Sequence, residues 1–447
     1  MRQSYSWSWV ETRVAHTIEV WQDGATRPAQ RGPRFGSSEQ QRRENAYDQG
    51  LRTVEHEAKR APLSPAERLG RQDRIVAAFA RFSASALDLK SEATQLLTHE
   101  FLPVGVKLAR WARRFDANLS MADIIQACRN AWTACGLQPL LGERVRITPS
   151  ILGYSLLYPY SDNYLDCEEV STQAKVDFSE RFRERLRGGR LPAQNSREVA
   201  LWTMVELIEG QYSRALYPQV FDCLLAIHRA QEESIAQVKT FSECDDAELL
   251  RVSCAKGGSS VLADACLARG WLNEEESQFS FDWGVLLQLG DDLQDVREDM
   301  ERGSVTLFSR AAAEGRPLDG LVIQLLNFSD RVGARMDCLS HGTAMLKDLL
   351  RMSWRSLIIG AVANSHEYFS PGFLNEAERS SPFRFDFLRA RRERLASRQG
   401  LYATLFDAFL EGPETEEDDL PPPNHQNVIC VEADPDLDPE EDRKAVC

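Results

Sequence analysis

Apolar residues recur three and four positions apart along most of this chain, which is the spacing of one face of an α-helix. No run of alternating apolar and polar residues interrupts this pattern, and 382–410 could form one more helix. Gly188–Gly189, Gly257–Gly258 and Gly303 are expected to break or cap helices. The pattern therefore predicts an all-α protein, with helices over 65–86, 92–114, 120–134, 147–166, 171–187, 196–213, 217–239, 245–269, 275–300, 317–340 and 343–364.

The two ends of the chain depart from this pattern. Residues 1–62 have poor periodicity and become rich in Arg, Gln, Gly, Pro and Glu, so we expect little fixed structure there. Residues 411–447 begin with a cluster of acids that is followed by three prolines, and this composition predicts a disordered acidic tail. The expected organisation is one helical domain over 63–410 between two poorly ordered extensions.

An acidic column is predicted near the end of the helix over 275–300. Asp291, Asp295 and Asp299 fall at i, i+4 and i+8, with Asp292 and Glu298 beside them. Positions at this spacing lie one above the other on a helix face, so the carboxylates repel one another. On a partly dehydrated wall each close pair costs roughly 2 to 3 kcal/mol at an effective dielectric near 20. Because apolar residues surround the acids, the pattern favours a buried helix beside a cation-filled cavity over a solvated acidic face.

A second acidic pair is predicted to form the opposite wall of this cavity. Asp162 and Asp166 stand at i, i+4 after the apolar run 151–160, and Glu168 and Glu169 follow them. Mg²⁺ binds through one or two carboxylates and keeps places for water and substrate phosphate oxygens. Two facing acidic helices therefore predict a site for Mg²⁺ with a diphosphate.

Composition and charge narrow the choice of partners. The chain has 447 residues and a formal charge of −15, which argues against nucleic acid as a partner because phosphate contacts need a basic face. Its ten cysteines show no metal-ligand spacing, and neither a signal peptide nor an apolar run of transmembrane length is present. We expect a cytoplasmic protein without a transmembrane segment; its oligomeric state is open, with a homodimer as one option.

The acidic segments resemble those of the class I isoprenoid synthase superfamily, all-helical bundles around a central cavity. The run from Asp295 to Asp299, followed by Arg302 and Gly303, is similar to the second acidic motif of squalene and phytoene synthases. The pair Asp162 and Asp166 is similar to their first motif. The resemblance spans roughly residues 95 to 370.

Other stretches resemble further branches of the same superfamily. Asp291-Asp292-x-x-Asp295 is similar to the second motif of trans-isoprenyl diphosphate synthases, and Lys256-Gly257-Gly258 resembles the lysine-containing turn that precedes it there. The stretch 206–237, together with both acidic segments, also looks like the bacterial large-terpene synthases. The match is therefore composite.

The resemblance implies a Mg²⁺-dependent enzyme that acts on a prenyl diphosphate. It implies catalytic roles for Asp162, Asp166, Asp291 and Asp295. It implies metal binding by Asp162, Asp166, Asp291, Asp292, Asp295 and Asp299. The candidate substrate-binding cations are Lys256, Arg297, Arg302, Lys107 and Arg110.

Departures from the family patterns favour a terpene synthase over a chain-elongating enzyme. No Arg-Arg pair follows Asp166, and Gly303-Ser304 stands where elongating synthases carry Gly-Lys. The alternatives are a squalene/phytoene-type condensing enzyme and a chain-elongating trans-isoprenyl diphosphate synthase. A third alternative is a catalytically silent helical scaffold, which Asn163 favours because it stands where many relatives have a second acid.

Overall fold

The computed structural model describes residues 5–24, 32–60, 64–167, 169–237, 245–410 and 420–422, and all regular elements in these ranges are helices. The all-α prediction is thereby confirmed for this part of the chain. The helices are α1 (Trp7–Gly24), α2 (Ser37–Ala58), α3 (Pro65–Ala86), α4 (Ser91–Gln95), η1 (Leu96–Phe101), α5 (Leu102–Phe115), α6 (Met121–Leu140), α7 (Pro149–Asp166), α8 (Thr172–Leu186), α9 (Ser196–Gln211), α10 (Pro218–Gln237), α11 (Asp246–Arg269), α12 (Glu274–Gln294), α13 (Val296–Arg302), α14 (Leu307–Ala313), α15 (Asp319–Cys338), α16 (Ala344–Asn364), η2 (His366–Tyr368), α17 (Pro371–Arg379), α18 (Phe385–Ala396) and α19 (Gln399–Leu410).

Side-chain caps set where the helices of the predicted bundle begin. The Ser64 hydroxyl accepts from the Glu67 amide, and Pro65 occupies the first turn of α3. Reciprocal capping boxes start α6 at Ser120 with Asp123, and α12 at Asn273 with Glu276. These local signals explain why the predicted starts of the helices agree so closely with the structure.

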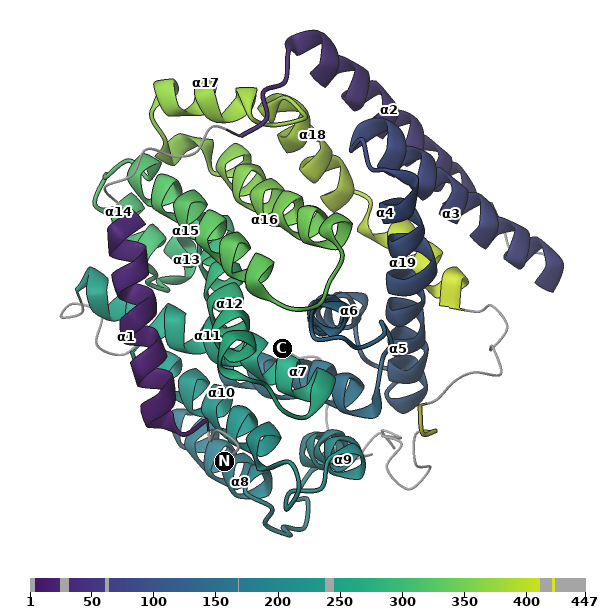
Figure 1. Cartoon of the computed structure of the whole chain (residues 1–447). Helices are drawn as coiled ribbons and strands as arrows, with labels where there is room; N and C mark the ends of the chain where they lie inside the picture. Colours follow the sequence, from purple (N-terminus) through teal and green to yellow (C-terminus); the bar gives the residue numbers. More distant parts are fainter. Residues whose placement is uncertain are drawn as a thin grey trace.

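The core is organised around α11 and α12, which pack closely on each other near the centre of the molecule (Figure 1). Their contact depends on Gly257, Gly258 and Gly284. A methyl group on Gly284 would overlap the carbonyl oxygen of Gly257, and one on Gly258 would overlap the Phe281 ring. The predicted break at Gly257–Gly258 is wrong, because these glycines lie inside α11 and serve the close approach of two backbones. Gly303 does cap α13, with φ of +72°.

Helix α1 corrects the prediction of little fixed structure in residues 1–62. It lies along α11 and α15 and buries Val10, Val14 and Trp21 against them. The Tyr5 hydroxyl, just before α1, is 2.6 Å from the Ser277 hydroxyl on α12. The apolar side chains of α1 follow a helical stripe, although the neighbouring Ser, Thr and Trp residues resemble a strand pattern.

Helix α2 corrects the same prediction for a different physical reason. It is strongly polar, and arginines near the C-terminal end of the described chain bind several of its carboxylates. The Arg384 amide and Nε donate to Glu44 at 2.9 and 3.0 Å, and Arg391 donates to Asp48 at 2.7 Å. Arg394 donates to Glu55 at 2.6 and 3.0 Å. Figure 1 shows α2 and α3 as a hairpin beside α18 and α19.

The predicted acidic tail, 411–447, lies outside the described residues except for 420–422. In that short stretch, the Pro421 carbonyl accepts a hydrogen bond from Trp111 Nε1 at 2.8 Å. Leu420 packs against the hydrophobic core. This point of the chain is therefore fastened to α5.

None of the helices in the described ranges combines the length and the apolarity that crossing a bilayer requires.

Candidate active site

The three aligned acids lie on two consecutive helices. The predicted single helix over 275–300 is interrupted at Asp295, which ends α12 and starts α13. The Asp295 amide nonetheless donates to the Asp291 carbonyl at 2.9 Å, and the Asp299 amide donates to the Asp295 carbonyl at 2.8 Å. Because these bonds keep the i to i+4 spacing, Asp291, Asp295 and Asp299 stay on successive turns, and we call them the acidic column.

The acidic column is poorly compensated. Burial raises the pKa of Asp291 and Asp295 above the ordinary carboxyl value. Burial, together with the charges of Asp292, Asp295 and Glu298, raises the pKa of Asp299 to about 7. The Asp291 side chain is 42% exposed although burial dominates its pKa. Asp291 is therefore open to a ligand, while its partial burial disfavours the charged form of its carboxyl.

Asp292 has a different task from its neighbours. Its two oxygens accept from Ser253 Oγ at 2.7 Å and from Gln288 Nε2 at 2.8 Å. The side chain is buried, and burial raises its pKa to about 6. Asp292 therefore ties α12 to α11, with both oxygens already engaged, and it suits the predicted metal-ligand role less well than the column does.

Two cations lie beside the column. Arg129 on α6 places Nη2 3.3 Å from Asp291 Oδ1. Lys256 on α11 is close enough for its charge to lower the pKa of both Asp291 and Asp292. Lys256 was expected on a turn, but it lies inside α11, one turn after Ser253. Its position beside the acids agrees with the predicted substrate-binding role.

Of the other predicted cations, Arg302 acts on the column, because its charge lowers the pKa of Asp299. Arg297 Nε donates to Glu367 at 2.9 Å, which turns it toward the end of α16. Arg302 pairs with Glu298 at 2.7 Å on the exposed side of α13. Lys107 and Arg110 lie on α5, where Arg110 Nε donates to the Leu410 carbonyl at 2.9 Å.

The first acidic segment ends α7. Asp162 accepts from the neighbouring Ser161 hydroxyl at 2.9 Å, and Asn163 Nδ2 donates to Asp123 Oδ1 at 2.9 Å. Asp166 is the last residue of α7, but its side chain lies outside the described part of the structure, as does Glu168.

Helix α6 connects the two acidic segments. The sequence analysis predicted a helix here but missed this connecting role. Asp123 contacts Asn163 of the first segment, and Arg129 contacts Asp291 of the second. Between them, Asn130 Nδ2 lies 3.2 Å from both Ser155 Oγ on α7 and Asp264 Oδ1 on α11. In the sequence, these residues are visible only as single polar positions among the apolar residues of 121–140.

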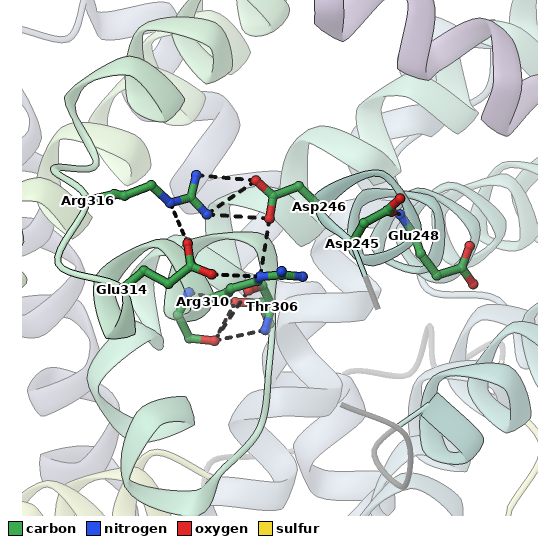
Figure 2. Close-up of polar contacts among 8 residues, drawn as sticks. Asp245, Asp246, Glu248, Thr306, Arg310, Glu314 and Arg316 are labelled. Atoms are coloured by element: carbon green, nitrogen blue, oxygen red, sulfur yellow. Dashed lines mark hydrogen bonds and ion pairs between the residues drawn. The ribbon is translucent and has the colours of Figure 1, made fainter. Parts of the chain in front are cut away.

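Helix α11 is fixed at its N-terminus by a group of ion pairs (Figure 2). Asp246 lies 3.3 Å from Arg316 and 3.5 Å from Arg310, and Glu314 bonds the same two arginines at 2.7 and 3.1 Å. The arginines come from α14 and the turn that follows it. This group connects the start of α11, the helix that carries Lys256, to the segment directly after the acidic column.

The donors of the acidic column fit Mg²⁺ in kind, although they do not enclose an ion by themselves. Carboxylate oxygens are the ligands that Mg²⁺ prefers, and a cation would relieve the repulsion that raises the pKa of Asp299. Within the described ranges, no three His, Cys, Asp or Glu side chains converge into a metal site. An ion held here would share its coordination with water and with oxygens of a substrate.

Compared with known proteins, this chain matches no family model, no curated protein and no solved structure. The functional argument therefore depends on the geometry of the site and on the chemistry of its residues.

Proposed function

We propose that this protein is a Mg²⁺-dependent class I terpene synthase that releases diphosphate from a prenyl diphosphate and converts the chain into a cyclised or quenched terpene. The observation that supports this most is the partly buried acidic column of Asp291, Asp295 and Asp299, with Lys256 and Arg129 beside it. Partly buried carboxylates that repel one another, with Arg129 and Lys256 beside them, suit a ligand that brings both metal ions and anionic oxygens.

Each residue has a distinct part in this proposal. The column carboxylates would hold Mg²⁺, and Asp162 and Asp166 at the end of α7 are the further metal ligands that the resemblance implies. Lys256 and Arg129 orient the anionic oxygens of the diphosphate and stabilise the charge that grows on them as the bond to carbon breaks. When bound, Mg²⁺ acts as a Lewis acid on those oxygens. Asp292 keeps the column in place by holding α12 against α11.

The hydrocarbon chain would extend below the column, between α6, α7 and α11. Tyr154 and Tyr158 on α7 are partly buried there, and aromatic faces stabilise nearby positive charge. Some polar groups along this path bind one another across the helices, as Tyr154 does with the Ser260 carbonyl at 3.3 Å. The chain therefore meets few free nucleophiles before it is quenched.

Incubation with prenyl diphosphates of ten to thirty-five carbon atoms tests the proposal. Mg²⁺-dependent release of diphosphate without isopentenyl diphosphate, together with a hydrocarbon or alcohol product, is the expected result. A strict need for isopentenyl diphosphate and a longer diphosphate product would identify a chain-elongating enzyme instead. Coupling of two prenyl chains would identify a condensing enzyme, and the absence of any turnover across the series would favour the silent scaffold.

A further inference from the structure

Asp264 is a buried acid that the proposed diphosphate chemistry does not use. It lies on α11 with only 1% of its surface exposed. Oδ1 accepts from Asn130 Nδ2 at 3.2 Å, whereas Oδ2 has no hydrogen-bond partner among the described residues. Buried polar atoms are normally hydrogen-bonded, so an Oδ2 without a partner among the described residues needs an explanation.

A second buried acid shows what a structural carboxylate looks like in this protein. Asp282 on α12 is 2% exposed, nearly as buried as Asp264. It accepts from Thr17 at 3.1 Å and Gln278 at 2.9 Å, and it pairs with Arg335 at 2.6 Å. Where a carboxylate only holds helices together, this fold surrounds it with donors and a cation. Asp264 lacks both on the side of Oδ2.

The position of Asp264 connects it to the acidic column. Lys256, Ser260 and Asp264 follow at i, i+4 and i+8 on one face of α11. Lys256 lies beside the column, and eight residues of helix place Asp264 about 12 Å further along the axis. Asn130 of α6 and Tyr154 of α7 face the same strip. A chain whose diphosphate is held at the column would thus extend toward Asp264.

The groups around Asp264 leave it able to accept a proton. Cys135 on α6 and Tyr154 on α7 are the titratable groups whose pKa its charge raises, and Lys256 is two turns away on its own helix. Burial raises the pKa of Asp264 well above its ordinary value, and the Asn130 hydrogen bond offsets this only in part. Burial therefore favours the protonated acid, and the ionised form, which alone can accept a proton, becomes populated at a higher pH than for an ordinary carboxyl.

We propose that Asp264 Oδ2 is the proton acceptor that ends the reaction, at the inner end of the site and away from the diphosphate. The inference rests on the proposed function. A C–H bond next to the cationic carbon breaks, its electron pair forms a C=C bond, and the proton moves to Oδ2. The products are a neutral alkene and a carboxylic acid, which loses its proton to solvent before the next turnover. Asn130 is the positioning residue that orients the carboxylate.

The test compares Asp264→Asn with wild type in the Mg²⁺-dependent reaction of the prenyl diphosphate that wild type converts. Two quantities are measured across pH: diphosphate release, and the share of the wild-type alkene among the products. We expect that share to fall about 10²-fold in the variant, with a much smaller fall in diphosphate release. In wild type the share should rise with pH, because the acceptor must be ionised; in the variant it should be flat.

Two further variants serve as controls for Asp264→Asn. Ser155→Ala removes the other acceptor of Asn130 and should leave the product pattern and its pH profile unchanged. If Asp264→Asn does not fold, Asn130→Ala carries the test, because loss of this donor should shift the pH profile. An unchanged alkene share and pH profile in the Asp264 variant, or a wild-type product that contains no alkene, would overturn the inference and leave the terpene synthase proposal standing. Absence of diphosphate release in wild type would overturn both.

Discussion

Acidic side chains lie on helices in two regions of this molecule, and their surroundings differ. On α2, Glu44, Asp48 and Glu55 are each bound by arginines from α18 or from the residues that flank it. On α12 and α13, Arg129 and Lys256 lie beside Asp291 and the charge of Arg302 acts on Asp299, yet the acids still raise the pKa of one another. Acidic residues thus hold α2 against the C-terminal helices, whereas in the acidic column they are poorly compensated.

This difference in pairing distinguishes carboxylates that stabilise the fold from carboxylates that serve a function. A carboxylate that serves the fold gains stability from its partners, as those of α2 do. A column that keeps like charges together lowers the stability of the metal-free protein, and groups with raised pKa values cluster at functional sites. The predictions below disturb each region in turn, from the largest expected effect to the smallest.

Neutralising the column should abolish turnover and stabilise the fold. Asp295→Asn removes one of the repelling charges, so the metal-free protein should unfold at a slightly higher temperature, while Mg²⁺-dependent diphosphate release falls by about 10²-fold or more. The matched control is Glu298→Gln, which removes an exposed acid paired with Arg302 and should keep turnover close to wild type. Wild-type turnover in Asp295→Asn would refute the role of the column.

The stability of the metal-free protein should fall as pH rises, because of Asp292. Its pKa is raised to about 6, so the protonated form stabilises the native state. That contribution is complete below the unfolded value near 4 and is lost as pH rises through about 6, up to about 3 kcal/mol. Urea unfolding of wild type and Asp292→Asn at pH 5 and pH 8 measures it. The stability of wild type relative to the variant should be lower at pH 8, and an equal difference at both values would contradict the prediction.

Removing an ion pair of α2 should lower the stability of the protein and leave diphosphate release unchanged. Glu44→Gln replaces a buried carboxylate by a weaker acceptor for the exposed Arg384, so the free energy of unfolding should fall by about 1 to 3 kcal/mol. The rate of diphosphate release per folded molecule should stay near wild type. Denaturant unfolding and an activity assay on the same sample decide this, and a selective loss of turnover would show that α2 belongs to the site.

The ion pairs at the start of α11 should contribute least. Arg316 is 45% exposed, and exposed pairs are typically worth about 0 to 1 kcal/mol. Arg316→Ala should therefore lower the free energy of unfolding by no more than this, with Arg310 still holding Asp246 (Figure 2). A loss greater than that of Glu44→Gln would mean that these contacts act as a network.

The sequence predicted the helices that bury an apolar stripe and begin with a cap. The structure gives α3 the predicted bounds, 65–86, and α7 and α16 lie within two residues of theirs. Helix α2 was missed because its sequence is strongly polar and several of its carboxylates pair with arginines some 340 positions away, and ion pairs at that separation leave no local period. Gly257 and Gly258 were misplaced since the same residue type serves a turn and a close helix contact.

The site was predictable in part for the same reasons. The acids of the column share one helix face, so spacing alone brought them together, and Lys256 was found through its neighbours. Arg129, Asn130 and Asp123 were missed because single polar residues in an apolar helix give no motif. Their roles depend on how α6 packs between α7 and α11, which only the tertiary structure reveals.

The central claim is that the acidic column awaits Mg²⁺ with a diphosphate, and unfolding in the presence of that ligand tests it most directly. With Mg²⁺ and diphosphate at 100 times the dissociation constant, the free energy of unfolding of wild type should rise by about 2.7 kcal/mol. Glu298→Gln should show the same rise, and Asp295→Asn should show little or none. No stabilisation of wild type, or an equal rise in Asp295→Asn, would contradict the account.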